Sequence, residues 1–104
     1  MIKKTDLNQT QIMLTLRKLG YSVFDTSEVG RGFPDLVIAK NSETYLIEIK
    51  SEKGKLNDKQ IEFTAKWNAE IFVIRNTDEA IAFDRHELEA VKPNRTEIVI
   101  NGYK

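Results

Sequence analysis

The sequence predicts a mixed α/β fold of the α+β kind, in which helices flank one mixed central sheet in the order α-β-β-β-α-β-α. Three observations predict it. Segments with helical periodicity alternate with short runs that are rich in β-branched and aromatic residues. A short polar turn separates two of these runs, which is typical of an antiparallel hairpin. A helical segment then leads to the last strand, and such a crossover joins parallel strands.

The first helix is expected to begin at Asp6, because Asp6 and Gln9 fit an Asp-x-x-Gln capping box. Three apolar residues then share one helical face: Ile12, Leu16 and Leu19. Gly20 ends this helix. Residues 21–26 are expected to form a strand, followed by a polar loop that contains two glycines. Residues 35–39 and 44–50 then form the two strands of the hairpin.

In the second half of the chain, Asn57 is expected to cap a helix, with Gln60 completing a second capping-box pattern. Residues 71–75 form a short apolar strand, parallel to the strand at 44–50. Residues 78–91 carry one or two helical pieces, which the region around Pro93 closes. Residues 96–100 have the composition of a further strand.

Composition limits the classes of protein that the chain can represent. Its 104 residues fit a single domain, 1–104, and they include no cysteine, which excludes disulfides, thiolate zinc sites and cysteine nucleophiles. No apolar run has the length of a membrane span, and the first residues lack a secretory apolar core, so we expect an intracellular, cytoplasmic protein with no membrane partner. Sixteen basic residues balance sixteen acidic ones, so net charge gives no indication of nucleic-acid binding.

Three ionisable residues are predicted to meet at one end of the hairpin. Symmetric pairing about the turn at 40–43 sets Asp35 opposite Glu48, and strand alternation puts Lys50 on the same face. Facing carboxylates destabilise a strand pair unless a cation lies between them. Magnesium commonly binds one or two carboxylates together with water and phosphate oxygens. The pattern therefore favours metal-assisted phosphodiester hydrolysis, with Lys50 stabilising developing charge.

Each part of this pattern also has an ordinary structural explanation. Glu-x-Lys on one strand face is common on solvated sheets, and Pro-Asp after a glycine is often just a turn that enters a strand. Only the predicted register, which brings the parts together, favours a site over these explanations.

The motifs together resemble the VRR-NUC branch of the PD-(D/E)xK nucleases over residues 6–80. They are Gly32-Phe33-Pro34-Asp35-Leu36, Leu46-Ile47-Glu48-Ile49-Lys50, Gly54-Lys55-Leu56 and Gln60. The resemblance implies a restriction-endonuclease-like core and a stand-alone nuclease domain, of the type found in phages and bacteria, with Mg²⁺ or Mn²⁺ as cofactor. It implies that Asp35, Glu48 and the main-chain carbonyl of Ile49 bind metal and that Lys50 is catalytic. Small free-standing members act as dimers on branched DNA, which implies a homodimeric, structure-selective endonuclease acting on branched, flap or four-way junction DNA.

Other positions have two interpretations each. Gln60 resembles a glutamine near the metal site in this family, yet it also fits a capping box. Family members tend to carry a glutamate in the first helix, where this chain has Asp6, Gln9 and Gln11. Gln9 is therefore either a participant in the site or a capping residue.

Basic residues in loops beside the site are candidates for phosphate binding, namely Arg31, Lys53 and Lys55, although exposed lysines are often only solubilising. The alternative function is a catalytically silent module for nucleic-acid binding or assembly that keeps the nuclease fold. A regulatory protein that acts through its surface is a third possibility, because fold does not fix function. Absence of metal binding would favour the silent module.

Overall fold

The structure, a computed structural model, describes residues 4–91, and its element order is the predicted α-β-β-β-α-β-α. Strand bounds differ from the predicted ones by about one residue, as is usual at the ends of elements. The elements are α1 (Lys4–Lys18), β1 (Ser22–Asp25), β2 (Leu36–Lys40), β3 (Glu43–Ile49), α2 (Asp58–Lys66), β4 (Ile71–Ile74) and α3 (Thr77–Asp84).

The four strands form one mixed sheet in the order β1-β2-β3-β4. The predicted hairpin and its register are confirmed, since Lys40 pairs with Glu43 and Val37 with Leu46. Asn41 and Ser42 in the turn both have positive φ, 54° and 68°, which suits a two-residue turn that follows the twist of the strands. The predicted parallel pairing of β3 with β4 is also confirmed.

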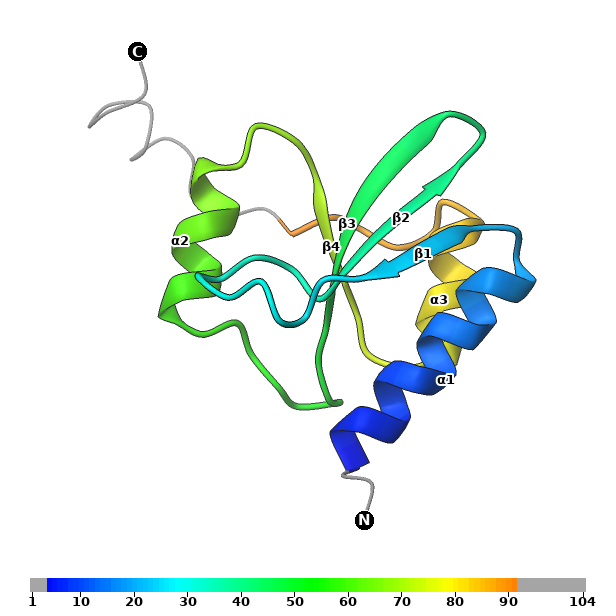
Figure 1. Cartoon of the computed structure of the whole chain (residues 1–104), viewed down its shortest axis with the longest axis horizontal. Helices are drawn as coiled ribbons and strands as arrows, with labels where there is room; N and C mark the ends of the chain where they lie inside the picture. Colours follow the sequence, from blue (N-terminus) through cyan, green and yellow to red (C-terminus); the bar gives the residue numbers. More distant parts are fainter. Residues whose placement is uncertain (1–3, 92–104) are drawn as a thin grey trace.

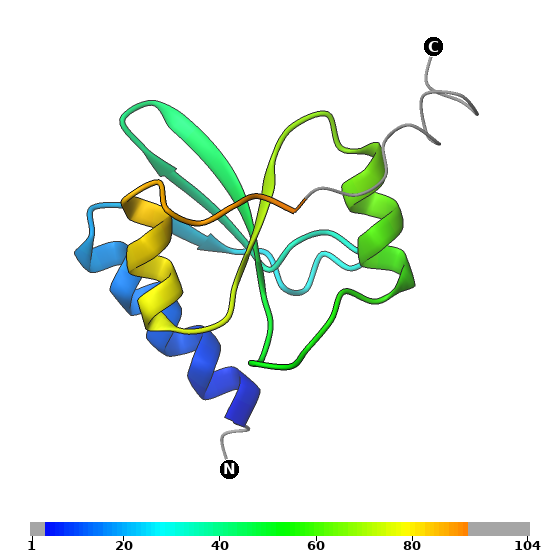
Figure 2. The same ribbon diagram turned by 180° about the vertical axis from the view of Figure 1, so that it is seen from behind.

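Helices cover the sheet unequally on its two sides. α1 and α3 lie side by side against one face, whereas α2 stands on the other side of the sheet, as both views show (Figure 1, Figure 2). The core lies between the first face and the α1–α3 pair. Its fully buried side chains include Ile12, Leu16, Leu36, Ile38, Ile47 and Ile74.

α2 is anchored through the loop that precedes β2. The rings of Phe33 in this loop and Phe63 in α2 pack edge to face, with centroids 5.3 Å apart. Gly32 packs against the first turn of α2, where a Cβ would collide with the carbonyl oxygen of Lys59. This close approach fixes where the helix begins relative to the sheet.

The predicted limits of two helices are wrong. α1 begins at Lys4, so Asp6 lies within the first turn and does not cap the helix. Its acidic side chain still suits that position, because carboxylates stabilise the N-terminal end of a helix. α3 begins at Thr77, one residue before the predicted start, because Asn76 caps it by accepting a hydrogen bond from the Glu79 N–H.

α3 ends at Asp84, and the described chain beyond it is not helical. His86 has a φ of 62°, and the Val91 N–H then donates to the carbonyl of Ile71 at the edge of β4. The predicted closure at Pro93 and the strand at 96–100 lie outside the described residues. Within residues 4–91, no helix combines the length and the apolar character needed to cross a membrane.

Candidate active site

Asp35 is held at the point where the β2–β3 ladder ends. β2 begins one residue later than predicted, at Leu36, so Asp35 lies just outside the strand. Its backbone carbonyl accepts a hydrogen bond of 2.7 Å from the Thr26 N–H. Its carboxylate oxygen Oδ2 accepts one of 2.9 Å from the Ile49 N–H of β3. The carboxylate of Asp35 thus accepts the hydrogen bond that a backbone carbonyl of β2 would accept if the ladder continued. This bond fixes the orientation of the Asp35 side chain.

Glu48 is the buried acid of the site. Its side chain leaves β3 on the side opposite to the Ile47 and Ile49 side chains, and the residue is only 3% exposed. Burial, reinforced by the nearby carboxylate of Asp35, raises the pKa of Glu48 to about 8, although the ammonium of Lys50 acts in the other direction. A buried carboxyl beside a second carboxylate favours either a proton or a cation.

Two side chains contact the same oxygen of Glu48. The amide Nε2 of Gln60 donates a hydrogen bond of 2.6 Å to Oε2, and the Nζ of Lys50 lies 3.7 Å from that oxygen. Gln60 also completes the predicted capping box, because its Oε1 accepts from the Asn57 N–H and its own N–H donates to Asn57. The two interpretations of Gln60 therefore hold together: it both caps α2 and contacts the site.

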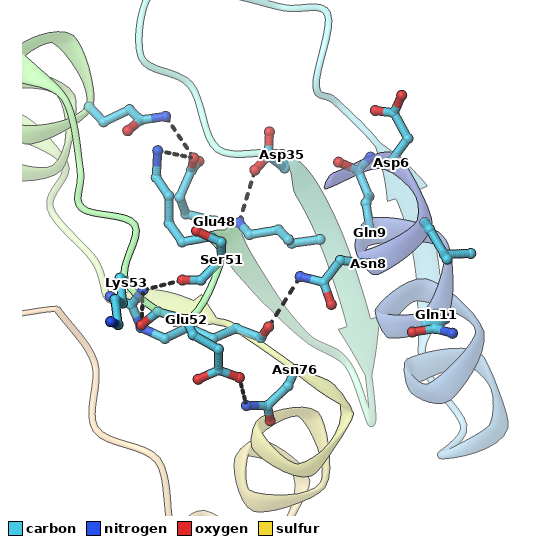
Figure 3. A pocket seen from close by; sticks show the side chains of 15 residues that line it. Asp6, Asn8, Gln9, Gln11, Asp35, Glu48, Ser51, Glu52, Lys53 and Asn76 are labelled. Carbon is cyan, nitrogen blue, oxygen red and sulfur yellow. Dashed lines mark hydrogen bonds and ion pairs between the residues drawn. The ribbon is translucent and has the colours of Figure 1, made fainter. Parts of the chain in front are cut away.

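An open pocket of about 790 Å³ contains the predicted central residues Asp35, Glu48, Ile49, Lys50 and Gln60. Figure 3 shows the first half of α1 on one side of this pocket and the loop after β3 on the other. Asp35 and Glu48 lie between these two walls, with their carboxylates on the same side of the hairpin (Figure 3). The structure thus brings the predicted acids and lysine together.

On α1, the residues Asp6, Gln9 and Gln11 all line the pocket. The capping interpretation of Gln9 is wrong, since α1 begins upstream of it. Its amide instead donates a hydrogen bond of 3.2 Å to Asp25, at the end of β1. Gln9 therefore stands beside the acids, with an amide where the resemblance leads one to expect a carboxylate.

The three basic candidates differ in their location. Lys53 lines the pocket, whereas Arg31 and Lys55 are exposed and lie outside its lining. The pocket has further polar residues that the sequence analysis did not select: Asn8, Ser51, Glu52, Arg75 and Asn76. One of them had a recognisable signal, because Asn76 stands three residues before Glu79 in the pattern of a helix cap.

The donor atoms of this pocket suit a hard divalent cation. Across residues 4–91, no cluster of three or more histidine, aspartate or glutamate side chains forms that could hold a metal ion. The available protein ligands are two carboxylates, from Asp35 and Glu48, with the Ile49 main chain beside them. Magnesium commonly takes one or two carboxylates and keeps several waters, so this oxygen-only set fits it.

The element order, with two acids and a lysine gathered at the end of the hairpin, agrees with what the resemblance to the PD-(D/E)xK nucleases implies. The sequence profile of the VRR-NUC domain matches residues 5–74, most of the chain. The chain therefore belongs to the VRR-NUC family, within the PD-(D/E)xK nuclease superfamily. Neither the curated proteins nor the solved structures gave a significant match.

Proposed function

We propose that this protein is an endonuclease that uses Mg²⁺ or Mn²⁺ to hydrolyse phosphodiester bonds in DNA. The observation that carries the proposal is the meeting of Asp35, Glu48 and Lys50 in one open pocket. Membership of a nuclease family supports the same reaction class. When bound, the cation would polarise the phosphate and lower the pKa of a water molecule.

The residues of the pocket would have separate roles in this reaction. Asp35 and Glu48 would hold the cation through carboxylate oxygens, and the Ile49 N–H and the Gln60 amide fix the orientation of these carboxylates. The ammonium of Lys50 lies 3.7 Å from Oε2 of Glu48, beside the carboxylates that would hold the cation. From this position it would stabilise the negative charge that develops on the phosphate oxygens in the transition state.

We further propose that the enzyme selects branched, flap or four-way junction DNA and acts as a homodimer. A chain of 12.0 kDa is too small to span a branched substrate alone, and two copies related by a twofold axis would present two sites. Lys53 at the pocket rim is the best-located phosphate contact, and Arg31 and Lys55 would extend it. Full junction cleavage by a protein that remains monomeric at assay concentration would overturn the dimer.

A second candidate function is a silent module that binds nucleic acid or assembles with other chains. The formal net charge of zero favours it, as does the amide of Gln9 at the position on α1 where the family resemblance leads one to expect a carboxylate. Metal binding separates the two functions. Isothermal titration with Mn²⁺ should give a site that Asp35→Ala removes; no heat of binding from folded protein would favour the silent module.

The deciding experiment is cleavage of labelled duplex, flap, four-way junction and single-stranded DNA with Mg²⁺ or Mn²⁺. We expect the native chain to cleave, and both Asp35→Ala and Lys50→Ala to lose activity, the second without losing Mn²⁺ binding. Exposed residues elsewhere provide matched controls, Asp78→Ala in α3 and Lys18→Ala in α1, which should cleave normally. If folded native protein cleaves no substrate with either metal, the proposed activity is wrong.

A further inference from the structure

The loop that follows β3 converges on the guanidinium of Arg75. The Nη1 atom of Arg75 donates hydrogen bonds to the carbonyl oxygens of Ser51 at 2.6 Å and Gly54 at 2.7 Å. A longer contact of 3.4 Å reaches the carbonyl of Glu52. Three carbonyl oxygens that point to one place repel one another unless a donor lies between them, and a charged donor makes the stronger bonds.

Arg75 is itself fixed from two other elements. Its backbone N–H donates to Oε1 of Glu79 in α3 at 2.8 Å, and its backbone carbonyl accepts a bond of 3.1 Å from the amide of Asn8 in α1. The next residue, Asn76, donates to the carboxylate of Glu52 at 2.8 Å, a contact visible in Figure 3. The loop is therefore attached to the place where α1, the β4–α3 turn and α3 meet.

The loop at 51–54 begins directly after Lys50, the lysine of the candidate site. β3 ends at Ile49, and Lys50 keeps a last ladder bond of 3.3 Å from its N–H to the carbonyl of Ile74. Beyond this bond the chain turns through Ser51 to Gly54, where the Gly54 N–H donates to the Ser51 carbonyl. Ser51, Glu52 and Lys53 are exposed, so packing contributes little to their order. Arg75 supplies the restraint that burial does not.

We infer that Arg75 is a positioning residue, which holds the loop at 51–54 so that Lys50 and Lys53 face the pocket in a fixed arrangement. The role in catalysis rests on the proposed nuclease function; the role in ordering the loop does not. Nη1 of Arg75 is bonded to the loop carbonyls, so a phosphate contact would have to use the other nitrogens of the guanidinium.

Limited proteolysis tests the ordering role without any activity. Trypsin cleaves after lysine, and the Lys53–Gly54 bond lies within the held loop. In Arg75→Met, which keeps the length of the stem but has no donor, we expect cleavage after Lys53 to be about tenfold faster under native conditions. Arg85→Met, at an exposed arginine beyond α3, is the matched control and should match the native rate. An unchanged rate in Arg75→Met would overturn the inference.

A second variant covers the case in which Arg75→Met does not fold. Arg75→Gln keeps a polar side chain at the pocket but is too short and too weak a donor to reach the three carbonyls. Its cleavage after Lys53 should also exceed the native rate, measured at a temperature at which circular dichroism shows full folding. Native-like protection in this folded variant would equally overturn the inference.

DNA measurements then separate positioning from phosphate binding. A positioning role predicts that Arg75→Met lowers kcat on the preferred DNA while KM and the salt dependence of DNA binding stay near native values. A direct phosphate contact would instead reduce the slope of log Kd against log salt by about 0.9, and that result would contradict the inference. If the native protein cleaves no DNA, the proposed function fails, yet the proteolysis result still decides whether Arg75 orders the loop.

Discussion

The side chain of Gln60 joins the start of α2 to the buried carboxylate of Glu48. Its Nε2 donates to Oε2 of Glu48 at 2.6 Å, while its Oε1 accepts from the Asn57 N–H at 2.9 Å. Each bond fixes the orientation of the amide for the other, because the donor and acceptor ends cannot be exchanged. A helix cap and a candidate active site therefore share one residue, and substitutions can separate its two roles.

The change Gln60→Glu should damage the site while keeping the cap. Glutamate serves as well as glutamine at the third position of a capping box, so the acceptor for the Asn57 N–H remains. The donor to Glu48 is replaced by a third carboxylate, which repels it. We expect thermal unfolding close to the native midpoint together with a loss of cleavage of about tenfold or more, measured on the preferred DNA substrate.

The reciprocal variant is Asn57→Ala, which removes the cap and leaves the amide of Gln60 able to reach Glu48. It should cost about 1 kcal/mol of stability, as loss of a helix cap usually does, with a much smaller effect on kcat. Denaturant unfolding and cleavage rates measured on both variants check the separation. Equal loss of activity in the two variants would show that the cap and the contact with Glu48 are not separable.

The hairpin and its acids could be predicted from the sequence because their geometry is local. A short polar turn between two strand-like runs sets the register, and the register sets Asp35 near Glu48. The contact of Gln60 with Glu48 could not be predicted in this way. It depends on where α2 lies relative to the sheet, which the close approach at Gly32 determines.

The parts of the site that sequence analysis missed come from distant segments. Arg75 and Asn8 meet the loop after β3 only because α1 and the β4–α3 turn converge at one end of the sheet. No periodicity or spacing along the chain predicts such a contact between distant segments. The start of α1 was missed for a local reason: Asp6 resembles a cap but equally suits the first turn.

Gly32→Ala should destabilise the protein and displace α2. Gly32 has a φ of 82°, which a residue with a Cβ adopts at a cost of about 1 kcal/mol, and its Cβ would also collide with the backbone of Lys59. Movement of the first turn of α2 would withdraw Gln60 from Glu48. We expect a loss of unfolding free energy of about 2 to 4 kcal/mol, measured with denaturant, together with weaker Mn²⁺ binding.

Gly30→Ala is the matched control for this steric effect. Gly30 has a similar φ of 79°, yet nothing lies within 4 Å of the position that its Cβ would occupy. Gly30→Ala should lose only about 1 kcal/mol of unfolding free energy, from the backbone conformation alone, and should keep native Mn²⁺ affinity. The difference between the two variants isolates the contact with α2, so equal effects would show that backbone conformation alone explains both.

A third prediction concerns the far end of the hairpin. Nζ of Lys40 donates to Oδ1 of Asp84 at 2.9 Å and to the Leu19 carbonyl at 2.7 Å, and both charged side chains are largely shielded from solvent. Lys40→Met should cost about 1 to 3 kcal/mol, because it leaves Asp84 without its cation. Cleavage at a temperature at which the variant is folded should remain native, since Lys40 lies at the opposite end of β2 from Asp35.

The same contact predicts a change in acid stability. The hydrogen bond from Lys40, followed by that from Tyr21, lowers the pKa of Asp84 below its usual value of 3.8. A lowered pKa adds stability that is present above the ordinary value and is lost as pH falls through the lowered one. Lys40→Met should therefore lose less stability than the native protein on acidification below about pH 4. A parallel loss in both proteins would contradict this assignment.

In the absence of metal, Glu48 should make the stability of the protein depend on pH in the direction opposite to Asp84. Its pKa of about 8 in the folded protein lies above the ordinary value of 4.5, so between these values the folded state holds a proton that the unfolded chain releases. Stability in EDTA should therefore fall as pH rises from about 5 to about 8, by up to about 1.4 kcal/mol per pH unit. Glu48→Gln cannot titrate and should flatten this slope, whereas Glu62→Gln, at an exposed position of α2, should not. Urea unfolding across this pH range measures the slope of unfolding free energy against pH. If Glu48→Gln kept the native slope, the proton would belong to another group.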